Sequence, residues 1–296
     1  MHAPSELLPP EALSRLVNLG LTARWIVEGF IAGLHASPFH GFSVEFAEYR
    51  QYVPGDDLKH FDWKALARSD RMYVKKYHSE TNTRAHVLLD CSASMGFGEP
   101  VTKLRYGAAI AAAISYLMML QQDAAGAVLF SDRVLRYVRP RSAMTHFREL
   151  AQALDSARPA TTTNAAQALH ELAETVKARG LFVLVSDLHD DLEKVVLGLR
   201  HLRFKGHEVL LFHVLDKDEV AFPYRTLSEF KDLETGERIQ VHPQVVRADY
   251  HRALDAFTDR MRRECSAMKV DYQLVDTKTP FDDVLARYLD RRRRLG

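Results

Sequence analysis

The chain has 296 residues, 47% of them hydrophobic, and its 40 lysines and arginines nearly balance its 39 aspartates and glutamates. That length and apolar content suffice for a buried core, which excludes a chain that is mainly disordered. The formal charge of +1 lacks the strong positive field that would make nucleic acid the expected partner.

The cysteines and the N-terminal segment bear on the cellular compartment. Cys91 and Cys265 are too few to build a disulfide framework, which favours a reducing compartment. The apolar stretch at residues 19–34 is interrupted by Arg24 and Glu28, so it falls short of the ~20 apolar residues that a membrane span needs. No pattern of a secretory signal precedes it. We therefore expect a cytoplasmic protein without a membrane span.

Residues 1–82 are expected to form an N-terminal helix and a β-rich subdomain. Pro9 opens an apolar segment with helical spacing, and Gly33 closes it, which predicts one helix. The rest of this region is expected to be extended at residues 41–52 and 72–78.

Residues 83–296 alternate between strand and helix patterns, which predicts a doubly wound three-layer α/β domain with a mostly parallel sheet. The gap between the strands at 125–130 and 134–138 is too short for a crossover helix, so that pair must be antiparallel. The other expected strands are at residues 85–89, 181–185, 208–214 and 270–275, with a small ribbon at 230–241. The expected helices are at residues 104–120, 145–157, 165–178, 192–204, 245–265 and 281–291, with Gly180 and Gly206 as C-caps.

Carboxylates and hydroxyls follow two of these strands directly. The first strand ends at Asp90, which Ser92 and Ser94 follow, and the strand at 181–185 leads to Asp187. Open parallel sheets bind ligands beyond the carboxyl ends of their strands, where the strand order reverses. The threonines at 161–163, in the loop before a helix, offer a further hydroxyl. Such hard oxygen donors suit Mg²⁺ or Mn²⁺.

The pattern Asp90-x-Ser92-x-Ser94, with a threonine and then an aspartate far downstream, resembles the metal-ion-dependent adhesion site of von Willebrand factor A-like domains. Upstream, the blocks at residues 45–57 and 62–68 resemble the bacterial family called domain of unknown function fifty-eight. The resemblance runs from about residue 10 to the C-terminus. It implies a von Willebrand factor A-like fold for residues 83–296. The implied metal ligands are Asp90, Ser92, Ser94, Thr163 and Asp187, with Thr161 and Thr162 as competitors of Thr163.

The resemblance also implies partners. Genes of this family often neighbour those of MoxR-type AAA+ ATPases, and these 296 residues contain no GxxxxGK[ST] phosphate-binding loop of their own. Because hydroxyl ligands are neutral, a bound ion would keep positive charge and an open position that a partner's carboxylate can fill. We expect a non-enzymatic, metal-dependent adaptor or assembly factor that works with such an ATPase and an acidic client protein.

An enzymatic alternative is a Mg²⁺-dependent phosphohydrolase that uses Asp90 as its nucleophile. Such enzymes place a second aspartate two positions further on as general acid, where this chain has Ser92. Cys91 is expected to be a small buried filler rather than a nucleophile. The histidines show no zinc-binding spacing such as HExxH.

Two charged segments remain. A buried network of charges and hydrogen bonds is expected to dock the N-terminal segment on the α/β domain; its members are Arg50, Asp56, Asp57, Asp62 and Arg68. The run Arg291 to Arg294 is expected to be a solvated helix end favoured by the helix dipole, with a phosphate or nucleic-acid contact as the alternative.

Overall fold

The computed structural model describes residues 9–15, 18–36, 48–51, 73–76, 83–160 and 164–295. The chain divides into two compact units, one made of residues 1–33 and 83–296 and the other of residues 34–82. The expected boundary near residue 82 coincides with one of these division points, whereas most of the N-terminal helix belongs to the same unit as the α/β domain.

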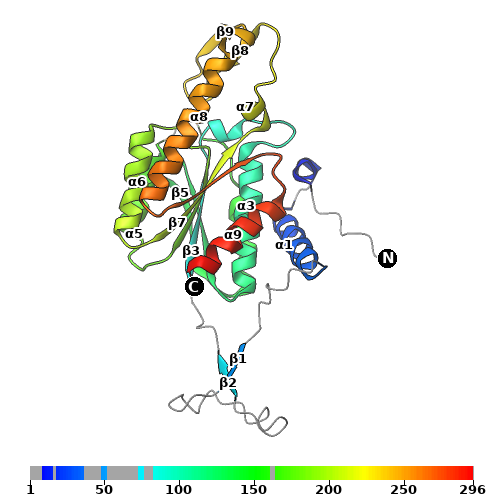
Figure 1. Ribbon diagram of the computed structural model, residues 1–296, viewed down its shortest axis with the longest axis vertical. Helices are drawn as coiled ribbons and strands as arrows, with labels where there is room; N and C mark the ends of the chain where they lie inside the picture. The colour runs from blue at the N-terminus through cyan, green and yellow to red at the C-terminus, as the bar shows by residue number, and fades with distance from the viewer. Residues whose placement is uncertain are drawn as a thin grey trace. The chain divides into compact units, whose positions relative to one another are not determined.

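A six-stranded sheet forms the centre of the larger unit (Figure 1). Its strands are β3 (Arg84–Asp90), β4 (Ala124–Phe130), β5 (Val134–Arg141), β6 (Leu181–Ser186), β7 (Glu208–Leu215) and β10 (Asp271–Asp276). The spatial order is β10-β7-β6-β3-β4-β5, and every neighbouring pair is parallel except β4 and β5. The predicted doubly wound α/β class, with its single antiparallel strand, is confirmed.

Helices cover both faces of the sheet, which makes the domain three-layered (Figure 1). On one face lie α5 (Ala165–Thr175), α6 (Leu192–Phe204) and α8 (Pro243–Ala267), whose apolar side chains join a core cluster with β3, β4, β6 and β7. On the other face lie α3 (Lys103–Leu120), α4 (Phe147–Asp155) and α9 (Phe281–Leu295). Smaller elements are η3 (Ser94–Gly96), η4 (Met144–His146), α7 (Lys217–Ala221) and the ribbon β8 (Ser228–Lys231) with β9 (Arg238–Val241).

The central strands are buried on both faces, as their uninterrupted apolar sequences require. All six residues of β6 are buried, and in β3 every residue after Arg84 is buried. The polar side chain of His86 is accommodated because its ring stacks on Phe182, with 5.0 Å between centroids, and its Nδ1 lies 3.4 Å from the Tyr137 hydroxyl.

The N-terminal helix differs from the prediction of one continuous helix. A 3-10 helix, η1 (Pro10–Arg15), comes first, and α1 (Leu19–Ala36) follows as a separate element. Asn18 accounts for the break, because its Oδ1 accepts the Leu21 amide at 3.1 Å and so caps the new helix. Polar capping at this position competes with a continuous helix that the apolar spacing alone suggests.

Two glycines that we expected at helix ends behave differently. Gly206, with φ +85°, follows the last turn of α6 and is confirmed at that C-terminus. Gly180 is not a C-cap, because α5 ends at Thr175 and is capped by Val176. A Cβ at Gly180 would lie 2.4 Å from the Arg84 carbonyl oxygen, so the absent side chain permits close approach of two backbone segments.

Within residues 34–82, the structure describes a short antiparallel pair, β1 (Glu48–Gln51) and β2 (Tyr73–Lys76), in which Glu48 is opposite Lys76. These strands fall inside two of the segments expected to be extended. The side chains of the expected charge network lie outside the described residues.

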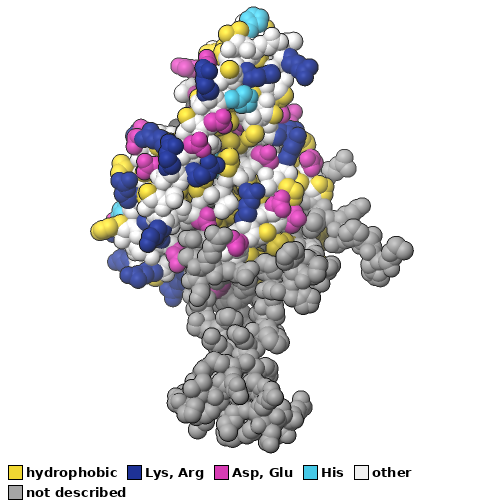
Figure 2. All heavy atoms as spheres, in the orientation of Figure 1, with side chains coloured by type: hydrophobic (Ala, Val, Ile, Leu, Met, Phe, Trp, Pro, Cys, Tyr) yellow, Lys and Arg dark blue, Asp and Glu magenta, His cyan; other side chains and the backbone are white. Residues whose placement is uncertain are grey.

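The face drawn in Figure 2 carries acidic and basic side chains that are interspersed over the same elements. This distribution agrees with the near-zero formal charge of the sequence. The side chains of Arg291 to Arg294 at the end of α9 lie outside the described part of the chain.

Candidate functional site

The strand order reverses between β3 and β6, and both strands end at the same edge of the sheet. After β3 the chain passes to β4 on one side, and it later returns to β6 on the other side. Asp90 ends β3 and Asp187 directly follows β6, so the two carboxylates lie at this switch point. Both are buried, with 1% and 5% of their surface exposed.

The loop after β3 folds tightly around Asp90. Its Oδ1 accepts the Ser92 amide at 2.8 Å, and its Oδ2 accepts the Ser186 hydroxyl at 2.5 Å. The hydroxyls of Ser92 and Ser94 lie 3.1 Å apart. The segment from the end of β3 to the start of η3 therefore gathers one carboxylate and two hydroxyls, and Ser186 of β6 adds a third hydroxyl. We call residues 90–94 the Asp90 loop.

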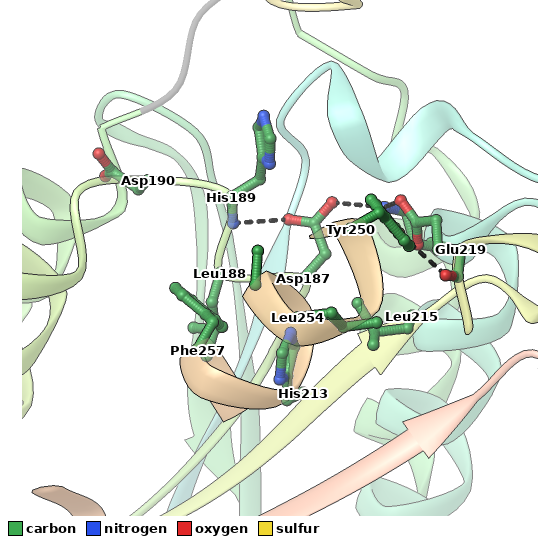
Figure 3. Close-up of a pocket in the computed structure, with 12 residues that line it drawn as sticks. Asp187, Leu188, His189, Asp190, His213, Leu215, Glu219, Tyr250, Leu254 and Phe257 are labelled. Atoms are coloured by element: carbon green, nitrogen blue, oxygen red, sulfur yellow. Dashed lines mark hydrogen bonds and ion pairs between the residues drawn. The ribbon is translucent and has the colours of Figure 1, made fainter. Parts of the chain in front are cut away.

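Asp187 is held by a buried ion pair that crosses between elements. Its Oδ2 accepts the Lys103 ammonium at 2.8 Å, and its Oδ1 accepts the His189 amide at 3.2 Å. The same ammonium reaches Glu219 Oε1 at 2.7 Å. Figure 3 shows Asp187 between His189 and Glu219, with these bonds dashed. Lys103 is 2% exposed, so it acts as an internal counterion.

The charges at this edge are unevenly balanced. Burial and then the charge of Asp187 raise the pKa of Asp90 to about 7, against the hydrogen bonds from Ser186 and Ser92. Burial also acts to raise the pKa of Asp187, but the Lys103 ammonium and the Ser94 hydroxyl hold it below its usual range. Asp90 is thus the carboxylate whose negative charge lacks a cation nearby, and a bound cation would relieve that cost.

Four of the five predicted ligands come together. Asp90, Ser92, Ser94 and Asp187 share this edge, whereas Thr163 lies outside the described residues, as do Thr161 and Thr162. The residues that flank those threonines are placed: the Ala160 amide donates to the Cys91 carbonyl at 2.6 Å, and Asn164 caps α5.

The donor set fits a hard divalent cation. Carboxylate oxygens retain a lone pair after accepting one hydrogen bond, and serine hydroxyls retain acceptor capacity when they donate. Among the described residues, no cluster of three or more His, Cys, Asp or Glu side chains is placed to hold a metal. A cation at the Asp90 loop would therefore depend on the hydroxyls together with the two aspartates, as the ligand preferences of Mg²⁺ allow.

Cys91, inside the loop, has the properties of a packing residue. It is free and buried, and its Sγ faces the Leu89 carbonyl at 3.6 Å. Burial and then the charge of Asp90 raise the pKa of its thiol to about 12, so the thiolate is scarce at neutral pH.

A pocket of about 490 Å³ opens beside Asp187. One wall is apolar and comes from α8, where Leu254 and Phe257 face the loop after β6 (Figure 3). His213 of β7 also lines it, and its Nδ1 pairs with the Tyr272 hydroxyl at 2.7 Å. Burial lowers the pKa of His213 to about 4, so this side of the pocket is neutral at pH 7.

Three further site residues were missed by the sequence reasoning: Lys103, Ser186 and Glu219. A lysine at the start of a mostly apolar helix was a signal for Lys103, since burying it requires a carboxylate partner. Glu219 belongs to a capping box with Asp216, a local pattern that predicts a helix start but no ion pair with α3. Ser186 carried no such signal.

The family model described as "Protein of unknown function DUF58" matches residues 48–260. The chain belongs to this family. Among its relatives are uncharacterized protein Rv1480 of Mycobacterium tuberculosis and uncharacterized protein Mb1516 of Mycobacterium bovis, each 28% identical over 268 residues, which cover 86% of this chain and 83% of the relative.

Solved structures with a similar arrangement are more distant. The conserved hypothetical protein BatB from Bacteroides thetaiotaomicron aligns with a TM-score of 0.48 and 13% identity, over 71% of this chain and 98% of that one. An aerotolerance-related membrane protein from Bacteroides fragilis gives 0.47 and 14%, over 71% and 99%. A von Willebrand factor type A structure from Catenulispora acidiphila gives 0.34 and 12%, over 49% and 35%. In the described part of this DUF58 chain, no helix is both long and apolar enough to cross a bilayer.

Leu188, which directly follows Asp187, has an unusual backbone conformation in this DUF58 member. Leu188 adopts φ +55°, in the left-handed region that glycine occupies without strain. The Ser186 hydroxyl accepts its amide at 2.9 Å, and its side chain is buried in the core cluster. Packing and hydrogen bonding therefore stabilise a left-handed backbone conformation that costs about 1–2 kcal/mol for a residue with a Cβ.

Proposed function

We propose that this DUF58 chain is a non-enzymatic, metal-dependent protein-binding module. Asp90, Ser92, Ser94 and Asp187 would hold Mg²⁺ or Mn²⁺, with a hydroxyl from the threonines at 161–163, of which Thr163 is our choice. When bound, the cation supplies positive charge at the sheet edge, where an acidic residue of a client protein can bind.

The observation that carries this proposal is the buried carboxyl group of Asp90 beside the hydroxyls of Ser92 and Ser94. Asp90 is 1% exposed, and the buried Lys103 ammonium at this edge pairs with Asp187 and Glu219. A buried carboxylate is costly when no cation lies beside it. A divalent cation would balance its charge, and the two hydroxyls and the second carboxylate could ligate the same ion.

The same loop argues against a phosphohydrolase that uses Asp90. In the Asp90 loop, Ser92 occupies the position two residues after the aspartate where such an enzyme needs a carboxyl group, and a hydroxyl cannot protonate a leaving group near neutral pH. A general phosphatase screen with Mg²⁺ separates the two functions. Activity that Asp90→Asn abolishes would favour the enzyme.

A MoxR-type AAA+ ATPase remains our proposed partner, together with an acidic client protein. The support for the ATPase is the family membership and the lack of a phosphate-binding loop in these residues. We also propose a cytoplasmic location, which the two free, buried cysteines support. Chelator should remove client proteins from a pull-down with the purified chain. A set of co-purifying proteins that chelator leaves unchanged would contradict the metal bridge.

Metal titration tests the site itself. Calorimetry with Mn²⁺ should show saturable binding to the wild type, none to Asp90→Ala, and weaker binding to Ser94→Ala, because each variant removes a proposed ligand. Ser115→Ala is the matched control, since Ser115 is buried in α3 and bonds only to the Ala111 carbonyl at 2.7 Å. Featureless heats that are the same for wild type and Asp90→Ala would refute the site.

A further inference from the structure

The turn of the β8–β9 ribbon reaches the Asp90 loop. Glu234 Oε1 accepts the Ser94 amide at 3.1 Å, a contact between residues 140 positions apart in the chain. Glu234 is half-buried, whereas its neighbours Leu233 and Thr235 are exposed. An acidic side chain of the ribbon turn thus contacts the loop that carries three of the proposed ligands.

The backbone of this turn is well defined. Asp232 Oδ1 accepts the amides of Glu234 at 2.7 Å and Thr235 at 3.3 Å, and the Gly236 amide donates to the Asp232 carbonyl at 2.9 Å. Gly236 closes the turn with φ +76°. These bonds fix the direction in which the Glu234 side chain leaves the ribbon.

The position of the carboxyl group matters because Ser94 offers two groups to the site. Its amide is held by one oxygen of Glu234, and its hydroxyl is a proposed ligand that lies 3.1 Å from the Ser92 hydroxyl. Within the described residues, the second oxygen of Glu234 makes no hydrogen bond. Glu234 therefore accepts the Ser94 amide with one oxygen and has a second oxygen close to the loop that would ligate a cation.

The base of the ribbon is anchored separately from its turn. Phe222 stacks on Phe230 of β8, with centroids 5.8 Å apart, and on Tyr250 of α8 at 4.6 Å. Figure 1 shows the ribbon beside the N-terminal end of α8. These aromatic contacts do not involve Glu234, so loss of the Glu234–Ser94 hydrogen bond would leave them in place.

We propose that Glu234 is an internal stand-in for the client's acidic residue. In the unbound protein its carboxylate takes the open position of the metal site, and a carboxylate on the client replaces it. This inference rests on the proposed function, since it needs a cation at the Asp90 loop. The client is thereby defined as a protein that presents an exposed Asp or Glu with enough further contacts to displace a tethered competitor.

Mn²⁺ binding to the full chain tests this role. Glu234→Ala should weaken Mn²⁺ binding about tenfold, because it removes a charged ligand. It should also raise the relaxation rate of water protons in the presence of protein-bound Mn²⁺, because a water molecule takes the vacated coordination position. Sodium acetate should then strengthen Mn²⁺ binding in Glu234→Ala and leave the wild type unchanged. Glu237→Ala is the matched control, since Glu237 is an exposed glutamate in the same turn.

The outcomes separate the two proposals. If the wild type binds Mn²⁺, and Glu234→Ala matches Glu237→Ala in affinity, relaxation and response to acetate, the role of Glu234 is refuted while the metal site stands. If the wild type binds no Mn²⁺, the proposed function fails and the inference fails with it. Thermal melting of both variants checks that the fold is retained.

Discussion

Lys103 is a cation that the chain itself places beside one of the two aspartates. Its ammonium lies 2.8 Å from Asp187 and 2.7 Å from Glu219, and most of the helix that carries it is apolar. Asp187 is thereby kept ionised by a side chain of the protein itself, whereas no ion pair with Asp90 is found among the described residues. The division of roles between two similar residues follows from which one the lysine reaches.

Lys103→Met should destabilise the fold strongly in the presence of chelator. The substitution introduces an apolar side chain of similar length and leaves Asp187 buried without its cation. Breaking a buried ion pair in this way costs about 3–5 kcal/mol of folding free energy. Urea denaturation measures the change.

Lys205→Met is the matched control, because Lys205 pairs with Glu174 on the surface, where side-chain exposure is 36% and 62%. Surface pairs contribute about 0–1 kcal/mol. Equal losses for the two variants would show that the Lys103 pair has no special weight.

At the scale of residues, the sequence identified the site residues that directly follow strands and missed the site residues brought in from elsewhere. Asp90 and Asp187 follow buried apolar runs, so their place at the sheet edge is a consequence of local pattern. Lys103 and Glu234 reach the site from α3 and from a ribbon turn. Their contacts depend on tertiary packing, which no short-range pattern encodes.

Among the elements, the hairpin β4–β5 brings two backbone segments close together at a glycine. A Cβ at Gly126 would lie 2.5 Å from the Val138 carbonyl oxygen and 2.6 Å from the Pro140 nitrogen. The register of the two strands also shifts between Ala125 and Ala127. Both obstructing atoms belong to the backbone, so they cannot rotate away as a side chain would.

Gly126→Ala should therefore lower the free energy of unfolding by about 1–3 kcal/mol, the usual cost of overpacking. Gly236→Ala is a comparison in which only the backbone angle matters, because nothing lies within 4 Å of a Cβ there and φ is +76°. We expect a smaller loss for it, about 1–2 kcal/mol. Chemical denaturation that ranks Gly236→Ala as the more damaging change would contradict this account.

Element boundaries were predictable where burial is continuous and less so where polar capping decides. The helix expected at 192–204 coincides with α6, whose start is fixed by Asp191 accepting the amides of Glu193 and Lys194. The five-residue α7 was missed, although Asp216 and Glu219 spell a capping box. Apolar spacing cannot reveal so short a helix, because it has no buried residues.

For the molecule as a whole, buried histidines make stability depend on pH. Burial, and then the charges of His207 and Arg84, lower the pKa of His86 to about 4. In the unfolded chain the ring titrates near its ordinary pKa of ~6.5, so below that pH the unfolded state binds the proton first. The stability that the neutral ring confers is complete above about pH 6.5 and is lost as the pH falls toward 4, by up to about 3 kcal/mol.

His86→Leu should therefore flatten the loss of stability between pH 6.5 and pH 4, as measured by urea denaturation at several pH values. His242→Leu, at an exposed position, should keep the wild-type slope. A slope that His86→Leu leaves unchanged would mean that other groups account for the acid sensitivity, with His213 the first to consider.

The strand order has a further consequence for solubility. It leaves β5 and β10 at the two ends of the sheet, where unpaired backbone groups invite a strand from another molecule. β5 carries three arginines at positions 136, 139 and 141 and a proline, Pro140, that cannot donate a ladder hydrogen bond. Like charges repel a second copy of the same strand, and the proline interrupts its pairing. The arginines and the proline of β5 thus protect this edge of the sheet against pairing with another molecule.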